Sequence, residues 1–221
     1  MSSKPSTTQA VKAILAAIER VEGPMPPKKR LIVEAAILCI SETGYAACST
    51  RMIANRAGVA EATIFRHFST KKDLLLRITE PVIEGNLVPA VAVEVEQILA
   101  RTGPDLRSFV RAILLSRLAF ADSYAPFVRI ILQELLVNSD LRAVVINHAA
   151  QAFAEIIPEN FAIFQTQGQI SNVPPERFLR IIISVLLGYY IHRSLIAPGN
   201  WDDEVEVDGM LDVVLQGVTP D

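Results

Sequence analysis

The chain has 221 residues, enough for one or two domains, and 51% of them are hydrophobic, with a mean hydropathy of +0.34. This composition supplies a sizeable core and excludes a largely disordered chain. The formal net charge of −3 argues against a protein coated in nucleic acid. However, residues 28–77 contain nine Lys and Arg against four Asp and Glu, whereas the rest contains 12 against 20. Positive charge is therefore concentrated in 28–77, the region that contains the candidate nucleic-acid-binding motif.

The two cysteines, Cys39 and Cys48, lack CxxC spacing, and no secretory signal is recognised. Reduced thiols and a cytoplasmic location are therefore expected. Buried packing is the preferred interpretation, and a redox switch between the two thiols is the alternative. The longest apolar run, Ile181 to Ile191, has 11 residues. Because a helix needs about 20 apolar residues to cross a bilayer, no membrane association is expected.

Residues 1–27 are predicted to form a polar tail and an additional helix. Apolar residues recur at helical spacing between Gln9 and Val21. The glycine and prolines from Gly23 to Pro27 then end the helix. This helix could pack on the domain that follows or lie along DNA, and the sequence leaves both possibilities open.

The next helix is predicted from Lys28 to Thr43, and Gly44 ends it. Its apolar side should cover the two shorter helices that follow, with Tyr45 beneath them. The residues expected on that side are Leu31, Ala35, Leu38 and Cys39.

The stretch from Ser49 to Lys72 has the sequence pattern of a helix-turn-helix. Ser49 can cap a helix of Thr50 to Ala57, and Gly58 suits the positive φ that commonly follows a helix end. A second short helix is predicted from about Glu61 to Phe68. Neither helix is long enough to bury its apolar side alone, so the two must pack on each other and on a third element.

The second of these helices has one inward and one outward face. Ile64 and Phe68 lie one turn apart on the inward face. The outward face, which could enter a DNA groove, carries Glu61, Ala62, Phe65 and Arg66. An aromatic residue on a solvated face favours contact with a partner.

The run GVAEATIFRHF followed by STKKDLL, with the later run QGQISNVPPERFLRIIISVLLGYY, resembles the TetR family of transcriptional regulators. The resemblance covers most of the chain from Lys28 onward and is most specific in the first third. It implies an all-α fold in which a three-helix helix-turn-helix DNA-binding domain precedes an antiparallel helical domain for effector binding and dimerisation. The expected domains are 1–27 for the tail and extra helix, 28–77 for DNA binding and 78–221 for effector binding and dimerisation.

By resemblance, ten residues form the set of candidate DNA contacts. They are Ser49, Thr50, Arg51, Glu61, Ala62, Thr63, Phe65, Arg66, His67 and Lys71. Lys71, His67 and Ser49 or Thr50 would hold phosphates. Arg51 and Arg66 could bind guanine or phosphate, and Phe65 a thymine methyl group. The alternative for Arg51 and Arg66 is an ordinary solvated charge, and for Thr63 an ordinary polar helix residue.

The sequence departs from the common family pattern at two positions of this region, Phe65 and Ala60. Phe65 stands where tyrosine is frequent and lacks a hydroxyl group that could reach a phosphate. Ala60 replaces a capping serine, at a cost of about 1 kcal/mol. Glu61 is favourable at a helix start but would repel a nearby phosphate.

A connecting helix is predicted to start at the capping-box-like run Thr70 to Asp73. Proline disrupts helix interiors, so Pro81 should end or kink this helix near Thr79 or Glu80. By resemblance a bend here could be the hinge that transmits effector binding, and an ordinary helix end is the alternative.

The remainder is predicted to be entirely helical, without strands or repeats. The predicted helices are 89–100, 105–121, 125–137, 140–167 kinked or split at Pro158, 175–197 and 203–216. Residues 178–191 are apolar over more than one face, so one side needs a further partner. A homodimer supplies it, and burial within the monomer is the alternative.

The resemblance places the dimer interface at about 140–167 and 175–197, where Gly188 fits a close approach. Two DNA readers would then meet half-sites about one or more turns of DNA apart, which predicts a pseudo-palindromic operator. The resemblance also implies an apolar or amphipathic small-molecule effector. The candidate pocket residues combine aromatic with polar side chains, as small-molecule sites do; they are Phe120, Tyr124, Phe127, Gln133, Glu134, His148 and Gln151. Core or surface positions are the alternative for each.

No catalytic residue, metal site or cofactor is expected. The three histidines lie far apart, and no HExxH, nucleophile elbow or phosphate-binding glycine loop occurs. The predicted function is a ligand-responsive regulator of transcription, with release of DNA by the effector as the default mode. The alternative is a helical ligand-binding or interaction protein with a vestigial helix-turn-helix.

Overall fold

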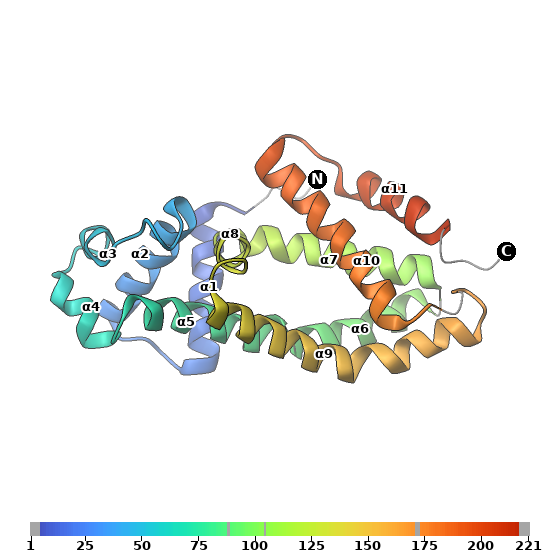
Figure 1. The fold of residues 1–221 in the computed structure, drawn as a ribbon, viewed down its shortest axis with the longest axis horizontal. Coiled ribbons are helices and arrows are strands. Elements are labelled where there is room, and N and C mark those ends of the chain that lie inside the picture. The colour runs from blue at the N-terminus through green and yellow to red at the C-terminus, as the bar shows by residue number, and fades with distance from the viewer. Residues whose placement is uncertain (1–4, 88, 104, 171–172, 217–221) are drawn as a thin grey trace. The chain divides into compact units, whose positions relative to one another are not determined.

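The computed structural model describes residues 5–87, 89–103, 105–170 and 173–216, in which every regular element is a helix (Figure 1). This confirms the all-α prediction. The α-helices are α1 Thr7–Glu22, α2 Pro27–Thr43, α3 Thr50–Ala57, α4 Glu61–His67, α5 Lys71–Val82, α6 Pro89–Thr102, α7 Leu106–Ser123, α8 Ala125–Glu134, α9 Ser139–Thr166, α10 Pro175–Ile191 and α11 Asp203–Gln216. Two π-helical turns, η1 Ile83–Leu87 and η2 His192–Ile196, follow α5 and α10.

The chain forms two compact units. The first comprises Met1–Val91 and Ala121–Gln151 and therefore holds α1 to α5, η1, α8 and the start of α9. The second comprises Ala92–Phe120 and Ala152–Asp221, which hold most of α6 and α7, the rest of α9, and α10 to α11.

Helix α1 is an integral part of the first unit. Its N-terminus has a full capping box, in which Ser6 Oγ accepts from the Gln9 amide and Gln9 Oε1 accepts from the Ser6 amide. Its apolar side packs on α2, α5, η1 and α8, and Ile14 and Ile18 are almost completely buried. Val21, the last residue of the apolar pattern, is exposed. The sequence left open whether this helix packs on the domain that follows or lies along DNA. In the structure its apolar side packs on the domain.

Helix α2 is buried around most of its circumference because α1, α3, α5 and α8 all pack on it. The sequence interpretation assumed a single apolar stripe and placed Leu31 on the inward side, but Leu31 is 47% exposed. The centre of the core is formed instead by Ile32, Ile37 and Ile40, all fully buried.

Helix α5 does not end near Thr79 or Glu80. It continues through Pro81 to Val82 and passes directly into the π-helical turn η1. The wider spacing of a π turn is one way for a helix to absorb a disturbed hydrogen-bond ladder. Gly85 in η1 also lies against α1, where an added Cβ would stand 2.9 Å from Val21 Cγ2.

The main differences from the predicted helices in the rest of the chain concern α8, α9 and α10. Helix α8 ends at Glu134 rather than at residue 137. Helix α9 is continuous from Ser139 to Thr166, so the alternative of a split at Pro158 is wrong. A helix of 28 residues tolerates the loss of one backbone hydrogen bond within it. The predicted helix 175–197 divides into α10 and η2.

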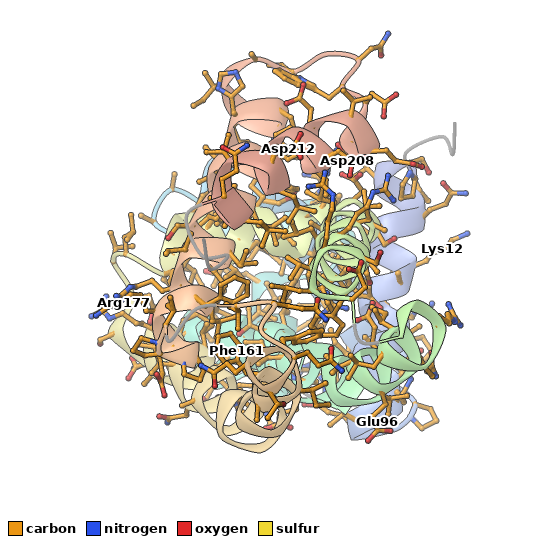
Figure 2. The ribbon with its side chains drawn as sticks, turned by 90° about the vertical axis from the view of Figure 1, so that its right-hand side faces the viewer. Lys12, Glu96, Phe161, Arg177, Asp208 and Asp212 are labelled. Atoms are coloured by element: carbon orange, nitrogen blue, oxygen red, sulfur yellow. The ribbon has the colours of Figure 1, made fainter. Side chains whose placement is uncertain are left out.

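The second unit is held by an apolar core and by ion pairs. On α7, Leu114 and Leu118 are almost fully buried. An ion-pair ladder joins α7 to α11: Arg111 Nε lies 2.9 Å from Asp208 Oδ1, and Arg107 Nη1 lies 2.7 Å from Asp212 Oδ1. Figure 2 labels both aspartates on α11.

The stretch Pro175–Ile196 spans 22 residues. Its most apolar window has a mean hydropathy of 1.4, and 22% of that window is buried. By length and composition alone it could cross a membrane. The sequence interpretation counted only the uninterrupted run Ile181 to Ile191 and missed this. A single such helix is weak evidence for a membrane span, because apolar helices at protein interfaces have the same composition.

Candidate nucleic-acid interface

Helices α3 and α4 form the predicted helix-turn-helix. Ser49 Oγ accepts a hydrogen bond of 3.1 Å from the Met52 amide and so caps α3. Gly58 follows α3 with φ +66° and ψ 33°, the left-handed conformation that glycine adopts at low cost. Ile53 of α3 and Ile64 of α4 are fully buried. As the sequence predicts, the two short helices share one apolar interior.

The outer face of α4 is open to solvent. Glu61, Ala62 and Arg66 are exposed, and Phe65 is 51% exposed although it is a large apolar side chain. Met52 of α3 is also 41% exposed and was not among the candidate contacts. The face combines charged, small and apolar groups, which are the kinds of group that contact base edges and thymine methyl groups in a major groove.

Thr63 differs from its neighbours on α4 because it is only 5% exposed. Its Oγ1 accepts a hydrogen bond of 2.9 Å from Arg66 Nη2, one helical turn away. In this position Thr63 orients the guanidinium group of Arg66.

The cations of residues 28–77 divide into two groups. Five are paired with carboxylates at the surface: Lys29 with Glu22, Arg30 with Glu19, Arg56 with Glu42, Lys72 with Asp140, and Arg77 with both Glu22 and Asp73. Within the described part of the chain, the others have no carboxylate partner; they are Lys28, Arg51, Arg66 and Lys71. Three of these four belong to the predicted contact set. Uncompensated positive charge is thus concentrated on the helix-turn-helix, as a phosphate-binding surface requires.

Lys71 is anchored at the start of α5. Its Nζ donates to the carbonyl oxygens of Tyr45 at 2.6 Å and Cys48 at 2.8 Å, and it lies 4.1 Å from the Tyr45 ring centroid. An ammonium group has three donors, so one is not used by these two carbonyl oxygens. The neighbouring Thr70 caps α5 by accepting from the Asp73 amide at 2.9 Å.

The remaining candidate contacts lie on the same two helices. Thr50 Oγ1 donates to Glu61 Oε1, which joins the first residue of α3 to the first residue of α4. Arg51 and His67 are exposed, as is the capping residue Ser49. The structure therefore places all ten candidates between Ser49 and Lys71; nine of them are at least partly exposed, and Thr63 is buried.

The candidate effector residues are not gathered in the same way. Phe127 of α8 is buried, Tyr124 and His148 are half-buried, and Gln133 is exposed. Phe120 belongs to the other unit, and the side chain of Gln151 lies outside the described residues.

A surface hollow of about 330 Å³ lies elsewhere in the first unit. Its lining residues are Tyr45, Ala46, Glu134, Val137, Asn138, Ser139 and Asp140. Of the candidate effector residues, only Glu134 is among them. In the described ranges, no group of three or more His, Cys, Asp or Glu side chains is placed to hold a metal ion.

The comparisons with known proteins agree with this geometry. Residues 32–78 match the family model described as bacterial regulatory proteins, tetR family. The chain is 27% identical over 172 residues to the HTH-type transcriptional regulator YvkB of Bacillus subtilis (strain 168), covering 76% of this chain and 84% of that protein. It is 40% identical over 52 residues to the fatty acid metabolism regulator protein of Bacillus subtilis (strain 168), which covers 24% of this chain and 27% of that protein.

Solved structures show the same fold. A fatty acid metabolism regulator of Clostridium perfringens superposes with a TM-score of 0.67 and 15% identity, covering 86% of this chain and all of that one (100%). The fold and the exposed helix-turn-helix define a DNA-binding regulator of transcription. Residues 32–78 therefore match the tetR family of bacterial regulatory proteins, and the chain as a whole is similar to a helix-turn-helix regulator of transcription.

Proposed function

We propose that the protein is a cytoplasmic homodimeric repressor that leaves a pseudo-palindromic operator when a small apolar or amphipathic effector binds, and that it has no enzymatic activity. The proposal depends first on the helix-turn-helix, where Arg51, Arg66 and Lys71 have no carboxylate partner within the described residues. Such a surface attracts the phosphate backbone, and the exposed α4 presents side chains to base edges.

The exposed apolar face of α10 supports the homodimer. This helix exposes three large apolar side chains, those of Ile181, Ile183 and Leu187, each by more than a third. Gly188 is exposed next to them, and no neighbouring atom lies within 4 Å of a Cβ built there. Permanent dimer interfaces are apolar in this way, so the interface is assigned to about 140–167 and 175–197.

The proposed effector domain is 78–221, and the proposed DNA-binding domain is 28–77 preceded by the helix in 1–27. The names of two similar proteins, both regulators of fatty acid metabolism, favour an amphipathic effector. A candidate set that combines aromatic with polar side chains agrees with that chemistry.

Selection of bound fragments from genomic DNA, followed by sequencing, tests the proposal. We expect enrichment of one motif with two-fold symmetry, bound with steep dependence on salt concentration. Light scattering should give a dimer. No binding to any duplex at low salt would support the alternative, a helical ligand-binding or interaction protein with a vestigial helix-turn-helix. Genes beside the selected fragments would then guide the choice of effectors to test for release.

A further inference from the structure

Glu61 is a carboxylate on the face of the protein that meets a polyanion. It is the first residue of α4 and is exposed. Within the described ranges its carboxylate makes one hydrogen bond, with Thr50, whose Oγ1 donates to Glu61 Oε1. Among the described residues no Lys, Arg or His forms an ion pair with Glu61. Its negative charge therefore stays on the DNA-facing side and must be accommodated when DNA binds.

The position of Glu61 at the start of α4 favours contact with a base edge over contact with the DNA backbone. In a helix-turn-helix the N-terminal residues of the recognition helix contact base edges. Ala62 beside it has only a methyl side chain and is exposed, so it leaves room for the longer Glu61 side chain. The hydrogen bond from Thr50 restricts the carboxylate and leaves Oε2 available as an acceptor.

The major groove offers few partners for an acceptor. Guanine presents O6 and N7, and thymine presents O4, all of which are acceptors that repel a carboxylate. Adenine presents an amino group, but its N7 acceptor lies directly beside it. Cytosine presents its N4 amino group without a neighbouring acceptor on the same base, and it is the base with which Glu and Asp side chains pair.

We propose that Glu61 selects cytosine at one position of each operator half-site by accepting a hydrogen bond from the N4 amino group, and that Thr50 is the positioning residue that holds the carboxylate for this contact. The inference rests on the proposed function, because it requires that α4 enters the major groove of an operator. It assigns Glu61 a specificity that its charge alone would not suggest.

The test is selection from a library of random duplexes by the full-length protein and by three variants. The wild type is expected to require a C·G pair at one position in each half-site. With Glu61→Ala, the rest of the motif should persist while the preference for cytosine at that position falls by about 5- to 150-fold. Glu61→Gln is expected to shift the preference toward adenine, because Gln pairs with adenine N6 and N7. Thr50→Val should reduce the cytosine preference partially.

Glu42→Ala is the matched control. It removes an exposed carboxylate of the same domain, but one near the end of α2 that is paired with Arg56. It should leave every base preference unchanged. Thermal melting of each variant shows that it is folded, and the isosteric Glu61→Gln keeps the test valid even where Glu61→Ala is destabilised.

Three outcomes would overturn the inference. If Glu61→Ala selects the same bases as the wild type, Glu61 does not read cytosine. A uniform gain in affinity for all duplexes, without a change in preference, would make Glu61 a general repeller of phosphate. A wild type that selects no motif at all would instead overturn the proposed function, and this inference with it.

Discussion

The backbone amide of Tyr45 donates a hydrogen bond of 3.3 Å to Glu134 Oε1. Tyr45 lies in the loop before α3, and Glu134 is the last residue of α8, so the bond joins segments 89 residues apart in the sequence. The same loop is held from its other side by Lys71, which donates to the Tyr45 and Cys48 carbonyl oxygens. The loop that leads into the DNA reader is thus fixed at both its amide and its carbonyl groups.

Glu134→Ala should destabilise the protein by about 1 to 3 kcal/mol, because Glu134 is only 6% exposed and its loss leaves the Tyr45 amide without its acceptor. Urea denaturation followed by circular dichroism measures this difference. Glu134→Gln keeps an acceptor oxygen and the side-chain volume, so its free energy of unfolding should fall by less than that of Glu134→Ala. Equal stability of Glu134→Ala and the wild type would show that water replaces the acceptor at no cost.

Lys71→Ala should weaken binding to all DNA sequences alike and lower the slope of log K against log salt by up to about one unit. The physical reason is the loss of one phosphate contact by the third ammonium donor. Fluorescence anisotropy over a range of salt concentrations measures the slope, with Lys28→Ala as a control cation at the start of α2.

An unchanged slope together with weaker binding would assign a different role to Lys71. Its hydrogen bonds to the Tyr45 and Cys48 carbonyl oxygens would then matter for the position of the loop alone.

Local signals in the sequence were sufficient to predict the helix-turn-helix. Ser49 as a cap, Gly58 with positive φ and Ile64 as a buried residue each follow from the chemistry of one position and its near neighbours. The exposure of Leu31 and the burial of Thr63 could not be predicted this way. Both depend on which elements pack on a helix and from how many sides, and a periodic pattern in one helix does not contain that information.

The same limit applies to the connections between elements. Pro81 predicts a disturbance of α5, but the sequence does not show that a π turn would absorb it. The contacts of Lys71 with Tyr45 and of Glu134 with the same residue join distant segments and follow only from the tertiary structure. For the effector, the composition of α7 to α9 indicates an apolar set of side chains but does not show which of them face a common space.

Arg66→Ala should cost about 1 to 3 kcal/mol more on the selected operator than on random DNA if Arg66 binds a base. Thr63→Val removes the hydroxyl group that accepts from Arg66 Nη2 and should lose part of the same discrimination. Competition binding with both DNAs measures the two differences. Equal losses on both DNAs would make Arg66 a positioning residue on the phosphate backbone.

The thiol of Cys48 should be unreactive in the folded protein at pH 8. Burial, with the neighbouring Cys39 thiol as a further cause, raises the pKa of Cys48 from its usual value near 9 to about 12. Both cysteines are buried. Since the thiolate is the reactive form, a thiol reagent should label the protein only after unfolding in urea. Rapid labelling of Cys39 and Cys48 in the native state would instead support the redox switch that the sequence left as an alternative.

The same shift predicts how stability depends on pH. The folded state holds the Cys48 proton more tightly than the unfolded chain, so the contribution of this group to stability is fully present below pH 9. It is lost as the pH rises from about 9 to about 12. The free energy of unfolding of Cys48→Ala should therefore fall less steeply than that of the wild type over this window. Parallel pH profiles for the two proteins would contradict the raised pKa.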